Sequence, residues 1–138
     1  MTPRVFIDTN VWFSAFYGSP NSDRILKAHV TGQIRGVISQ KVLHELVENI
    51  SKKIPPALPS LRAFLEAAPP EILADPEEVP PNIALLAHKK DRLILTAADQ
   101  GQVKILVTEN IKDFKPAGIL QQLQIEIITP AELAARLK

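Results

Sequence analysis

The chain contains no cysteine. Disulfide cross-links, thiolate metal sites and cysteine-based catalysis are therefore excluded, and the absence suits a protein of the reducing cytoplasm, where we expect this one to reside. The sequence also has no apolar run near the roughly 20 residues that cross a bilayer. The short run near the amino terminus ends on Asp8, which argues against a signal peptide. We therefore expect no association with membranes.

A strong excess of charge of one sign is also missing. Sixteen lysine and arginine residues stand against fifteen aspartate and glutamate residues, for a formal net charge of +1. The chain is thus not a polycation, and any binding of nucleic acid must depend on a local group of cationic side chains. With 46% hydrophobic and 22% charged residues, its 138 residues indicate one globular domain, 1–138, around a single core.

Short apolar runs alternate with helical patterns along the chain. Strands are predicted at about residues 4–8, 36–39, 103–107 and 125–128. Helices are predicted at about residues 11–17, 20–32, 40–50, 82–87, 91–100 and 130–137. Strands separated by helices form a parallel sheet with helices on both faces. We therefore predict an α/β fold, a three-layer α/β/α sandwich with four to five central strands.

Three local patterns refine this prediction. Eight of the twelve prolines fall between residues 54 and 81, so this segment is predicted to be insertion-like, with turns around one short helix near 61–67. Ser39 should cap the next helix, whose buried face would carry Leu43, Leu46, Val47 and Ile50. Gly101 should end the helix at 91–100 as a C-terminal glycine.

Acidic residues stand at the ends of the predicted elements. They are Asp8 after the first strand, Glu45 after the second, Asp91 at the start of the helix before the third, and Glu109 and Asp113 beyond the third, where the neutral amide Asn110 follows Glu109. Because parallel strands point one way, these segments crowd onto one edge of the sheet. Clustered carboxylates raise one another's pKa, a cost met by protonation or by a bound cation. Oxygen ligands without histidine or thiolate clusters favour Mg²⁺ or Mn²⁺, ions that assist in-line attack on a phosphodiester.

Each acid alone has a simpler interpretation. Asp8 can cap the helix that begins near residue 11, and Asp91 can complement a helix dipole. Glu45 lies away from the apolar stripe of its helix, so by itself it reads as a solvated residue. Glu109 and Asp113 in a loop need no special explanation. The sequence therefore indicates a site only through the whole set.

The order and spacing of these motifs resemble the PIN-domain family of metal-dependent ribonucleases, many of which are similar to the toxins of toxin-antitoxin pairs. The matching segments cover nearly all of residues 4–133. They are VFIDTNV at 5–11, GSP at 18–20, VIS at 37–39 with Glu45 downstream, KD at 90–91 with 93–98, LVTEN at 106–110 with KDF at 112–114, and ITPAE at 128–132.

The resemblance implies a PIN-like fold and a set of metal ligands. Asp8, Glu45 and Asp91 would hold Mg²⁺ or Mn²⁺ directly or through water. Many members place an aspartate just after the Val-Thr pair, where this chain has Asn110, so Asp113 is expected to supply the charge with Asn110 assisting. Residues expected to orient ligands and water around this set are Thr9, Asn10, Thr108, Glu109 and Asn110.

The same resemblance implies an endoribonuclease that hydrolyses RNA phosphodiesters, the toxin of a type II toxin-antitoxin system. An antitoxin protein and a second copy of the chain are the expected partners. The alternative is a non-catalytic PIN-like module that binds RNA or a protein, which Asn110 makes plausible. A phospho-accepting receiver and a haloacid-dehalogenase-type phosphatase fit less well, because Thr108 and Asn10 stand where those families need a lysine and an aspartate.

Two further groups of residues have an open role. Lys89, Lys90 and Arg92 flank Asp91 and are either contacts for the RNA backbone or ordinary solvated surface. An aromatic cluster in the second element is expected to serve core or dimer packing more than base stacking; its members are Trp12, Phe13, Phe16 and Tyr17.

Overall fold

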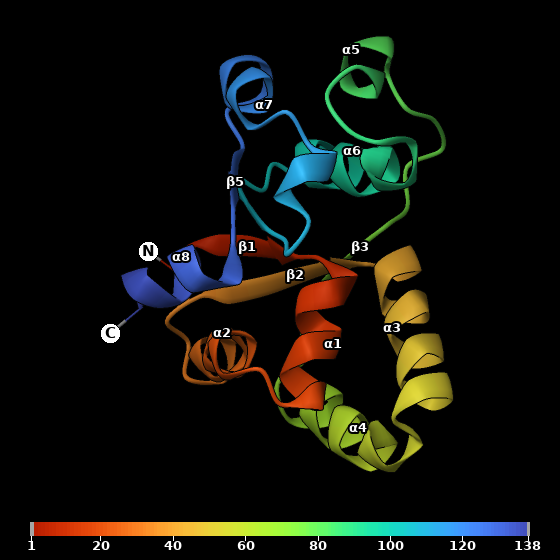
Figure 1. Ribbon diagram of the computed structural model, residues 1–138, viewed down its shortest axis with the longest axis vertical. Helices are drawn as coiled ribbons and strands as arrows, with labels where there is room; N and C mark the ends of the chain where they lie inside the picture. Colours follow the sequence, from red (N-terminus) through yellow and green to blue (C-terminus); the bar gives the residue numbers. More distant parts are fainter. Residues whose placement is uncertain (1, 138) are drawn as a thin grey trace.

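A sheet of five parallel strands runs through the middle of the molecule (Figure 1). The computed structural model describes residues 2–137. Its strands are β1 (Arg4–Ile7), β2 (Arg35–Ser39), β3 (Glu71–Leu73), β4 (Ile105–Val107) and β5 (Glu126–Ile128), in the order β3-β2-β1-β4-β5. Each neighbouring pair is parallel. The predicted α/β class and the number of strands are confirmed.

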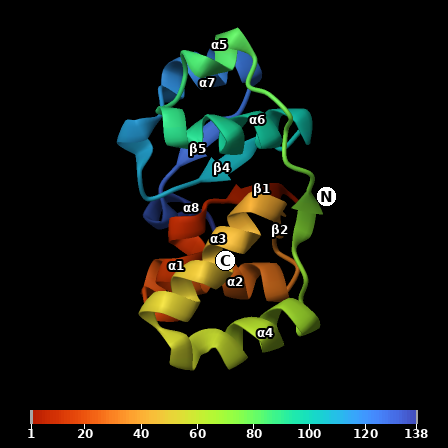
Figure 2. The same cartoon turned by 90° about the vertical axis from the view of Figure 1, so that its right-hand side faces the viewer.

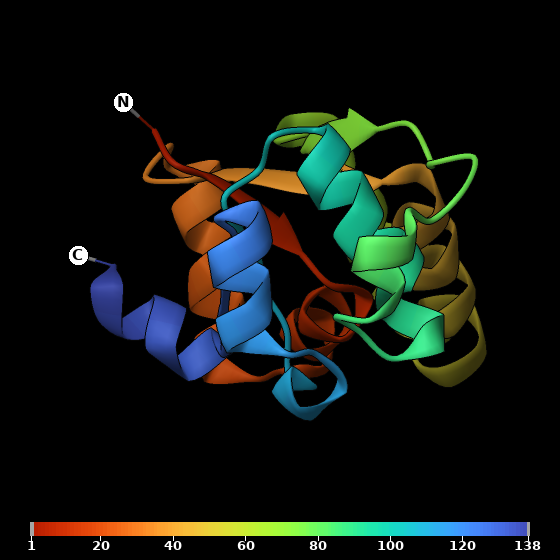
Figure 3. The ribbon, with the colours of Figure 1, turned by 90° about the horizontal axis from the view of Figure 1, so that it is seen from above.

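Helices cover both faces of this sheet, which gives three layers (Figures 1 and 2). One face carries α1 (Thr9–Tyr17), α2 (Pro20–Val30), α3 (Gln40–Lys53), α4 (Leu58–Ala67) and α8 (Pro130–Arg136). The other carries α5 (Pro81–Ala84), α6 (Arg92–Gln100) and α7 (Pro116–Leu123). Three single turns of 3₁₀ helix complete the fold: η1 (Pro55–Ala57), η2 (Lys89–Asp91) and η3 (Ile111–Asp113). In the view from above, α6 and α7 lie over the sheet (Figure 3).

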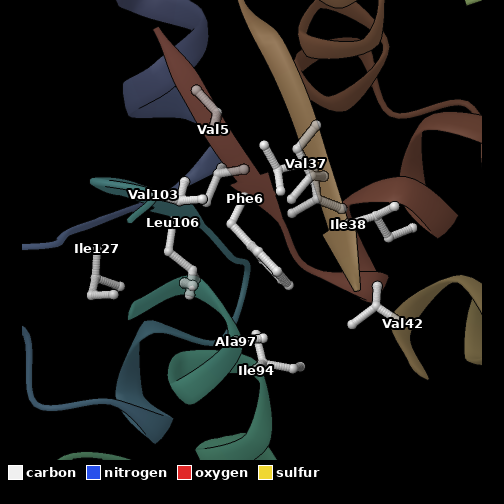
Figure 4. Packing of buried hydrophobic residues seen from close by; sticks show 14 of the residues in the cluster. Val5, Phe6, Val37, Ile38, Val42, Ile94, Ala97, Val103, Leu106 and Ile127 are labelled. Atoms are coloured by element: carbon white, nitrogen blue, oxygen red, sulfur yellow. The ribbon is translucent and has the colours of Figure 1, made fainter. Parts of the chain in front are cut away.

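The core forms because the strands are apolar on both sides. Val5, Phe6 and Ile7 of β1 are fully buried, as expected for a central strand covered by helices on each face. Figure 4 shows Phe6 and Leu106 on the side of the sheet that faces Ile94 and Ala97 of α6. Deleting one such side chain typically costs about 2–5 kcal/mol.

The strand order creates a switch point beside β1. The chain proceeds outward from β1 through β2 to β3, then crosses back to β4 and β5 on the other side of β1. In open parallel sheets the crevice for ligands lies at such a reversal, beyond the carboxyl ends of the strands. Asp8 follows the last residue of β1 directly, so it lies at this reversal.

The proline-rich segment differs from its prediction, because it belongs to the sheet. Residues 71–73 form β3, an edge strand that pairs with β2 and was not predicted. Arg4 of β1 fastens it, with Nε donating to Oε1 of Glu71 at 2.9 Å. The short helix predicted near 61–67 is confirmed as α4, and the helix expected at 82–87 is the shorter α5. A three-residue strand without an alternating pattern gives little sequence signal.

The structure differs from the prediction in two smaller details, at Val47 and α7, and adds to a third, at Gly101. Val47 is 40% exposed, because the buried face of α3 carries Val42, Leu46 and Ile50 instead. Helix α7 was not predicted, although Pro116 stands in its first turn, a favoured position. Gly101 does end α6, but its φ is −81°, and the left-handed residue is Gln102 with φ 57°. No helix within residues 2–137 has the length and apolar character needed to cross a membrane.

Candidate functional site

A small cleft of about 180 Å³ opens at the switch point of the sheet. Its walls come from four separate segments: the β1–α1 junction, α3, the η2–α6 junction and the loop after β4. The residues that line it are Asp8, Thr9, Asn10, Glu45, Asn49, Lys90, Asp91, Ile94 and Asn110. Three of the predicted acids therefore share one cleft, although they are far apart in the sequence.

Asp8 is the most constrained of these acids. It is 4% exposed and caps α1, with Oδ1 accepting from the backbone N–H of Thr9 at 2.7 Å. Its Oδ2 accepts from the Thr108 hydroxyl at 2.8 Å. Burial raises the pKa of Asp8, these two hydrogen bonds lower it in part, and the negative charge of Glu45 raises it again. Capping and a site role are thus compatible for this residue.

Asp91 lies across the cleft and is 6% exposed. It stands at the start of α6, but its side chain makes no capping hydrogen bond, so the simple cap interpretation does not account for it. Its Oδ2 is buried without a hydrogen-bond partner among residues 2–137. Burial and the nearby charge of Asp8 raise the pKa of Asp91 to about 6. Such a carboxylate is costly to ionise without a proton or cation beside it.

Glu45 enters the cleft from the middle of α3 and is half-buried, not fully solvated. Asn49, one helical turn further along α3, lines the same cleft and was not identified from the sequence. Its spacing of four residues from Glu45 places the two on one helix face. This i, i+4 relation is the signal that could have revealed Asn49.

Lys90 is the one cation among the residues that line the cleft, and its charge opposes the pKa rise of both Asp8 and Asp91. Its Nζ lies 3.4 Å from Oδ2 of Asp113. Asp113 itself does not line the cleft but belongs to an adjacent hollow, and its charge contributes to the raised pKa of Asp91. The predicted fourth acid thus lies beside the cleft and touches it through Lys90.

The other predicted supporting residues divide into two groups. Thr9, Asn10 and Asn110 line the cleft, and Thr108 connects it to β4, since its hydroxyl also accepts from the backbone N–H of Asn110 at 3.1 Å. Glu109 points elsewhere: its Oε2 accepts from the Ser14 hydroxyl of α1 at 2.7 Å. Its backbone N–H still donates to Oδ1 of Asn10 at 3.2 Å.

The charged residues around Asp91 have different positions. Lys89 is exposed and lines neither hollow, whereas Arg92 lines the adjacent one and donates from Nε to the carbonyl of Ala87 at 3.2 Å. Over residues 2–137, no group of three or more acidic, histidine or cysteine side chains is arranged to hold a metal ion. The acids therefore share a cleft without forming a closed ligand cage.

The aromatic cluster of α1 serves packing at two levels. Trp12 is fully buried and meets Phe64 of α4 edge to face at 5.7 Å between ring centroids, as Phe16 does at 6.1 Å. Tyr17 is 70% exposed and stacks on Phe13 at 6.0 Å. Core packing accounts for Trp12 and Phe16, whereas Phe13 is partly buried against the core and carries the exposed ring of Tyr17 on its outer side.

Solved structures with this fold align with most of the chain. VapBC2 from Rickettsia felis, bound to a DNA fragment from their promoter, aligns with a TM-score of 0.59 and 19% identity over 91% of this chain and 98% of that one. A toxin-antitoxin complex from Klebsiella pneumoniae gives 0.60 and 22% over 91% and 97%. The PIN domain endonuclease Utp24 gives 0.54 and 17% over 91% and 84%. At these identities the likeness shows the fold alone.

No curated protein matches the chain. The family model described as PIN domain matches residues 4–112, which contain the whole of β1 to β4 and every residue that lines the cleft. The chain therefore belongs to the PIN domain family.

Proposed function

We propose that this protein is a Mg²⁺- or Mn²⁺-dependent endoribonuclease that hydrolyses RNA phosphodiesters at the cleft of Asp8 and Asp91. The single observation that supports this most is that, within residues 2–137, the buried Oδ2 of Asp91 has no hydrogen-bond partner in a cleft that it shares with a second buried carboxylate. Two such groups repel each other, and a cation is one way to relieve the repulsion. Membership of the PIN domain family supports nuclease chemistry at this place.

The donor set suits a hard divalent ion. Asp8, Glu45 and Asp91 would hold it, with Asn110 as a neutral oxygen donor and Asp113 adding charge from beside the cleft. Mg²⁺ keeps several waters and typically takes only one or two carboxylates, so an open arrangement of acids is compatible with it. When bound, such an ion supplies activated water and positive charge for in-line attack on a phosphodiester.

The protein's own groups would orient and balance this chemistry. Thr108 and the N–H of Thr9 hold the Asp8 carboxylate in one orientation. The ammonium of Lys90, kept near the cleft by Asp113, would attract the phosphate that is attacked. The amide side chains of Asn49 and Asn110 can donate to a phosphate oxygen or hold a water at the edge of the cleft.

Cleavage of a structured RNA tests this proposal. Wild type should cut in the presence of Mg²⁺ or Mn²⁺ and stop when a chelator is added. Asp8→Asn and Asp91→Asn should each lose at least about 100-fold in rate, a typical cost of removing a positioned catalytic group. Asp99→Asn, further along α6, is the matched control and should retain activity. Cleavage that survives the chelator and both substitutions would leave the non-catalytic binding module as the better account.

We further propose that the protein is the toxin of a toxin-antitoxin pair, as the likeness to the Klebsiella pneumoniae complex suggests. Expression of wild type should then arrest growth, whereas Asp8→Asn should not, and co-expression of the antitoxin should restore growth. A short reading frame just upstream that encodes a DNA-binding protein is the expected antitoxin. Equal growth with wild type and Asp8→Asn would contradict the toxin role.

A homodimer is part of the same proposal. Exposed Tyr17 on α1, stacked on the half-buried Phe13, is an aromatic surface available for it, with Lys53 of α3 at 5.5 Å from the Phe13 ring. Tyr17→Ser should shift the protein toward the monomer in sedimentation if this surface is used. An unchanged dimer would place the interface elsewhere, and a wild-type monomer would contradict the dimer.

A further inference from the structure

Beside the acidic cleft lies a second hollow, of about 370 Å³, with an opposite charge character. Its lining includes Arg92, Lys112 and Lys115, with Leu85 on the wall and Asp113 on the side toward the cleft. We call it the basic hollow. Neither Lys112, which the sequence showed only as part of the KDF motif, nor Lys115 was a candidate binding residue, because only the fold places them in one hollow with Arg92.

The basic hollow and the acidic cleft meet at one ion pair. Lys90 lines the cleft, Asp113 lines the hollow, and their charged atoms lie 3.4 Å apart. The carboxylate of Asp113 is 17% exposed and is engaged by Lys90. The positive charge of Arg92, Lys112 and Lys115 is therefore not cancelled inside the hollow by its one acid.

The walls of the hollow are fixed by backbone contacts. Ala87 and Phe114 form an isolated antiparallel bridge between the segment before η2 and the segment after η3. On either side of it, the N–H of His88 donates to the Asp113 carbonyl at 2.7 Å, and the N–H of Lys115 donates to the Leu86 carbonyl at 2.9 Å. The concave shape is thus built into the fold and does not depend on long side chains alone.

The cations of the hollow have spare capacity for a ligand. Arg92 uses Nε on the Ala87 carbonyl, which fixes the guanidinium plane while its terminal nitrogens remain available. Within residues 2–137 neither Lys112 nor Lys115 makes an ion pair, in contrast to Arg4, Lys27 and Arg136. An anion in the hollow could therefore bind these cations without breaking an existing ion pair.

The acidic cleft by itself is poorly suited to bind a polyanion. It holds three carboxylates and one lysine, so without a cation it repels a polyanion. A nucleic-acid backbone presents a charge at every nucleotide, and cationic side chains that neutralise its phosphates supply most of the affinity. A backbone that reaches the cleft passes the Lys90–Asp113 pair and meets the basic hollow.

We propose that the basic hollow binds a phosphate of the RNA backbone adjacent to the one cleaved, and so provides the affinity that the acidic cleft lacks. This inference depends on the proposed nuclease function for its substrate. An acidic protein segment is the alternative occupant. The phosphodiester backbone is favoured because the hollow adjoins the cleft and presents a forked guanidinium beside two lysines, groups suited to phosphate oxygens.

The test measures binding of a short fluorescein-labelled single-stranded RNA of mixed sequence, in chelator, as a function of salt. Lys112→Gln/Lys115→Gln should weaken binding several-fold and reduce the slope of log K against log salt by about 0.7 for each phosphate that is no longer neutralised. Lys52→Gln/Lys104→Gln removes the same charge away from the hollow. Lys52 lies in the last turn of α3, and Lys104 directly precedes β4, at the amino ends of the strands. This control should keep the wild-type slope. Leu85→Ser should keep it too.

Cleavage kinetics separate this inference from the proposed function. With Mg²⁺ present, Lys112→Gln/Lys115→Gln should raise KM and leave kcat nearly unchanged, the pattern expected when ground state and transition state are weakened equally. If wild type cleaves RNA but the double variant keeps the wild-type salt slope and KM, phosphate binding in the basic hollow is contradicted, and the nuclease proposal stands. Wild type that binds with the expected slope but never cleaves would reject the nuclease alone. A slope lowered equally by the control pair would also overturn the inference.

Discussion

The hydroxyl of Thr108 donates a hydrogen bond of 2.8 Å to Oδ2 of Asp8, across 100 positions of sequence. The same hydroxyl accepts from the backbone N–H of Asn110. It therefore joins the end of β1 to the loop after β4, where the two neighbouring parallel strands deliver their residues to the cleft. Thr108 is fully buried, so no bulk water can replace these bonds when they are removed.

Thr108→Val should consequently affect both stability and the site. Loss of the hydroxyl leaves the buried Asp8 oxygen less satisfied, which should cost about 1–3 kcal/mol of unfolding free energy. It should also raise the pKa of Asp8 further, since the bond favours the charged carboxylate. Chemical denaturation and a cleavage assay check both effects.

Thr96→Val is the matched control for this variant. Thr96 is also fully buried, and its hydroxyl donates to the Arg92 carbonyl within α6, outside the cleft lining. It should alter stability while sparing cleavage per folded molecule. Equal activity in the two valine variants would mean that the Thr108–Asp8 bond has no role in the site.

Asp91→Asn should stabilise the protein while it removes activity. Among the residues that the structure describes, one oxygen of the buried wild-type carboxylate has no hydrogen-bond partner, and Asp8 lies close by. Replacing that charge by a neutral amide should add about 1–2 kcal/mol to the unfolding free energy at pH 7 in the absence of divalent ions. Thermal unfolding in chelator measures this. A lower melting temperature for Asp91→Asn would show that the charge is satisfied in a way the cleft geometry does not indicate.

The raised pKa of Asp91 should also make the stability of the protein depend on pH. The pKa of Asp91 is raised from 3.8 to about 6, so the folded state binds this proton more tightly than the unfolded chain does. The resulting stabilisation is complete below about pH 4 and is lost as the pH rises through about 6. Asp8, whose pKa is also raised, contributes in the same direction.

Comparison with Asp91→Asn isolates this effect from the other carboxyl groups. The difference in unfolding free energy between wild type and the variant should change between about pH 4 and 6 and be flat above about pH 7. Urea titrations in chelator at each pH provide the values. A difference that does not vary with pH over this range would mean that Asp91 ionises normally in the folded protein.

Gly101 provides a test of the fold away from the site. A Cβ at this position would lie 2.6 Å from Cδ1 of Leu73 in β3 and 3.2 Å from the Ala97 carbonyl oxygen. Gly101→Ala should therefore destabilise by about 1–3 kcal/mol through overpacking, although its φ is accessible to alanine. Gly101→Ala/Leu73→Ala should recover part of that loss relative to Leu73→Ala alone. Additive losses in denaturation experiments would contradict the contact.

The sequence predicted the strands and helices that have a regular local pattern. The strand that ends on Asp8, the cap at Ser39 and the helix after Asp91 are local features, and the structure contains all three. The strands were predicted to be parallel, so their carboxyl ends had to lie at one edge of the sheet. This predicted the common cleft of Asp8, Glu45 and Asp91.

What the sequence did not predict depends on tertiary contacts. Strand β3 has three residues and exists through its pairing with β2 and the Arg4–Glu71 contact. Val47 was placed in the buried stripe because the helical period alone does not fix which edge of a wide apolar face meets the sheet. Lys112 and Arg92 line the same hollow because the segment before η2 and the segment after η3 pair through Ala87 and Phe114, a contact that no local pattern predicts.

Cation binding at pH 7 tests the central claim most directly. Titration calorimetry with Mn²⁺ should detect binding to wild type and to Asp99→Asn. The same titration should show that binding is lost or weakened at least about 10-fold in Asp8→Asn and in Asp91→Asn. Wild-type affinity in both of those variants, or no Mn²⁺ binding to wild type, would contradict a metal-dependent site in this cleft.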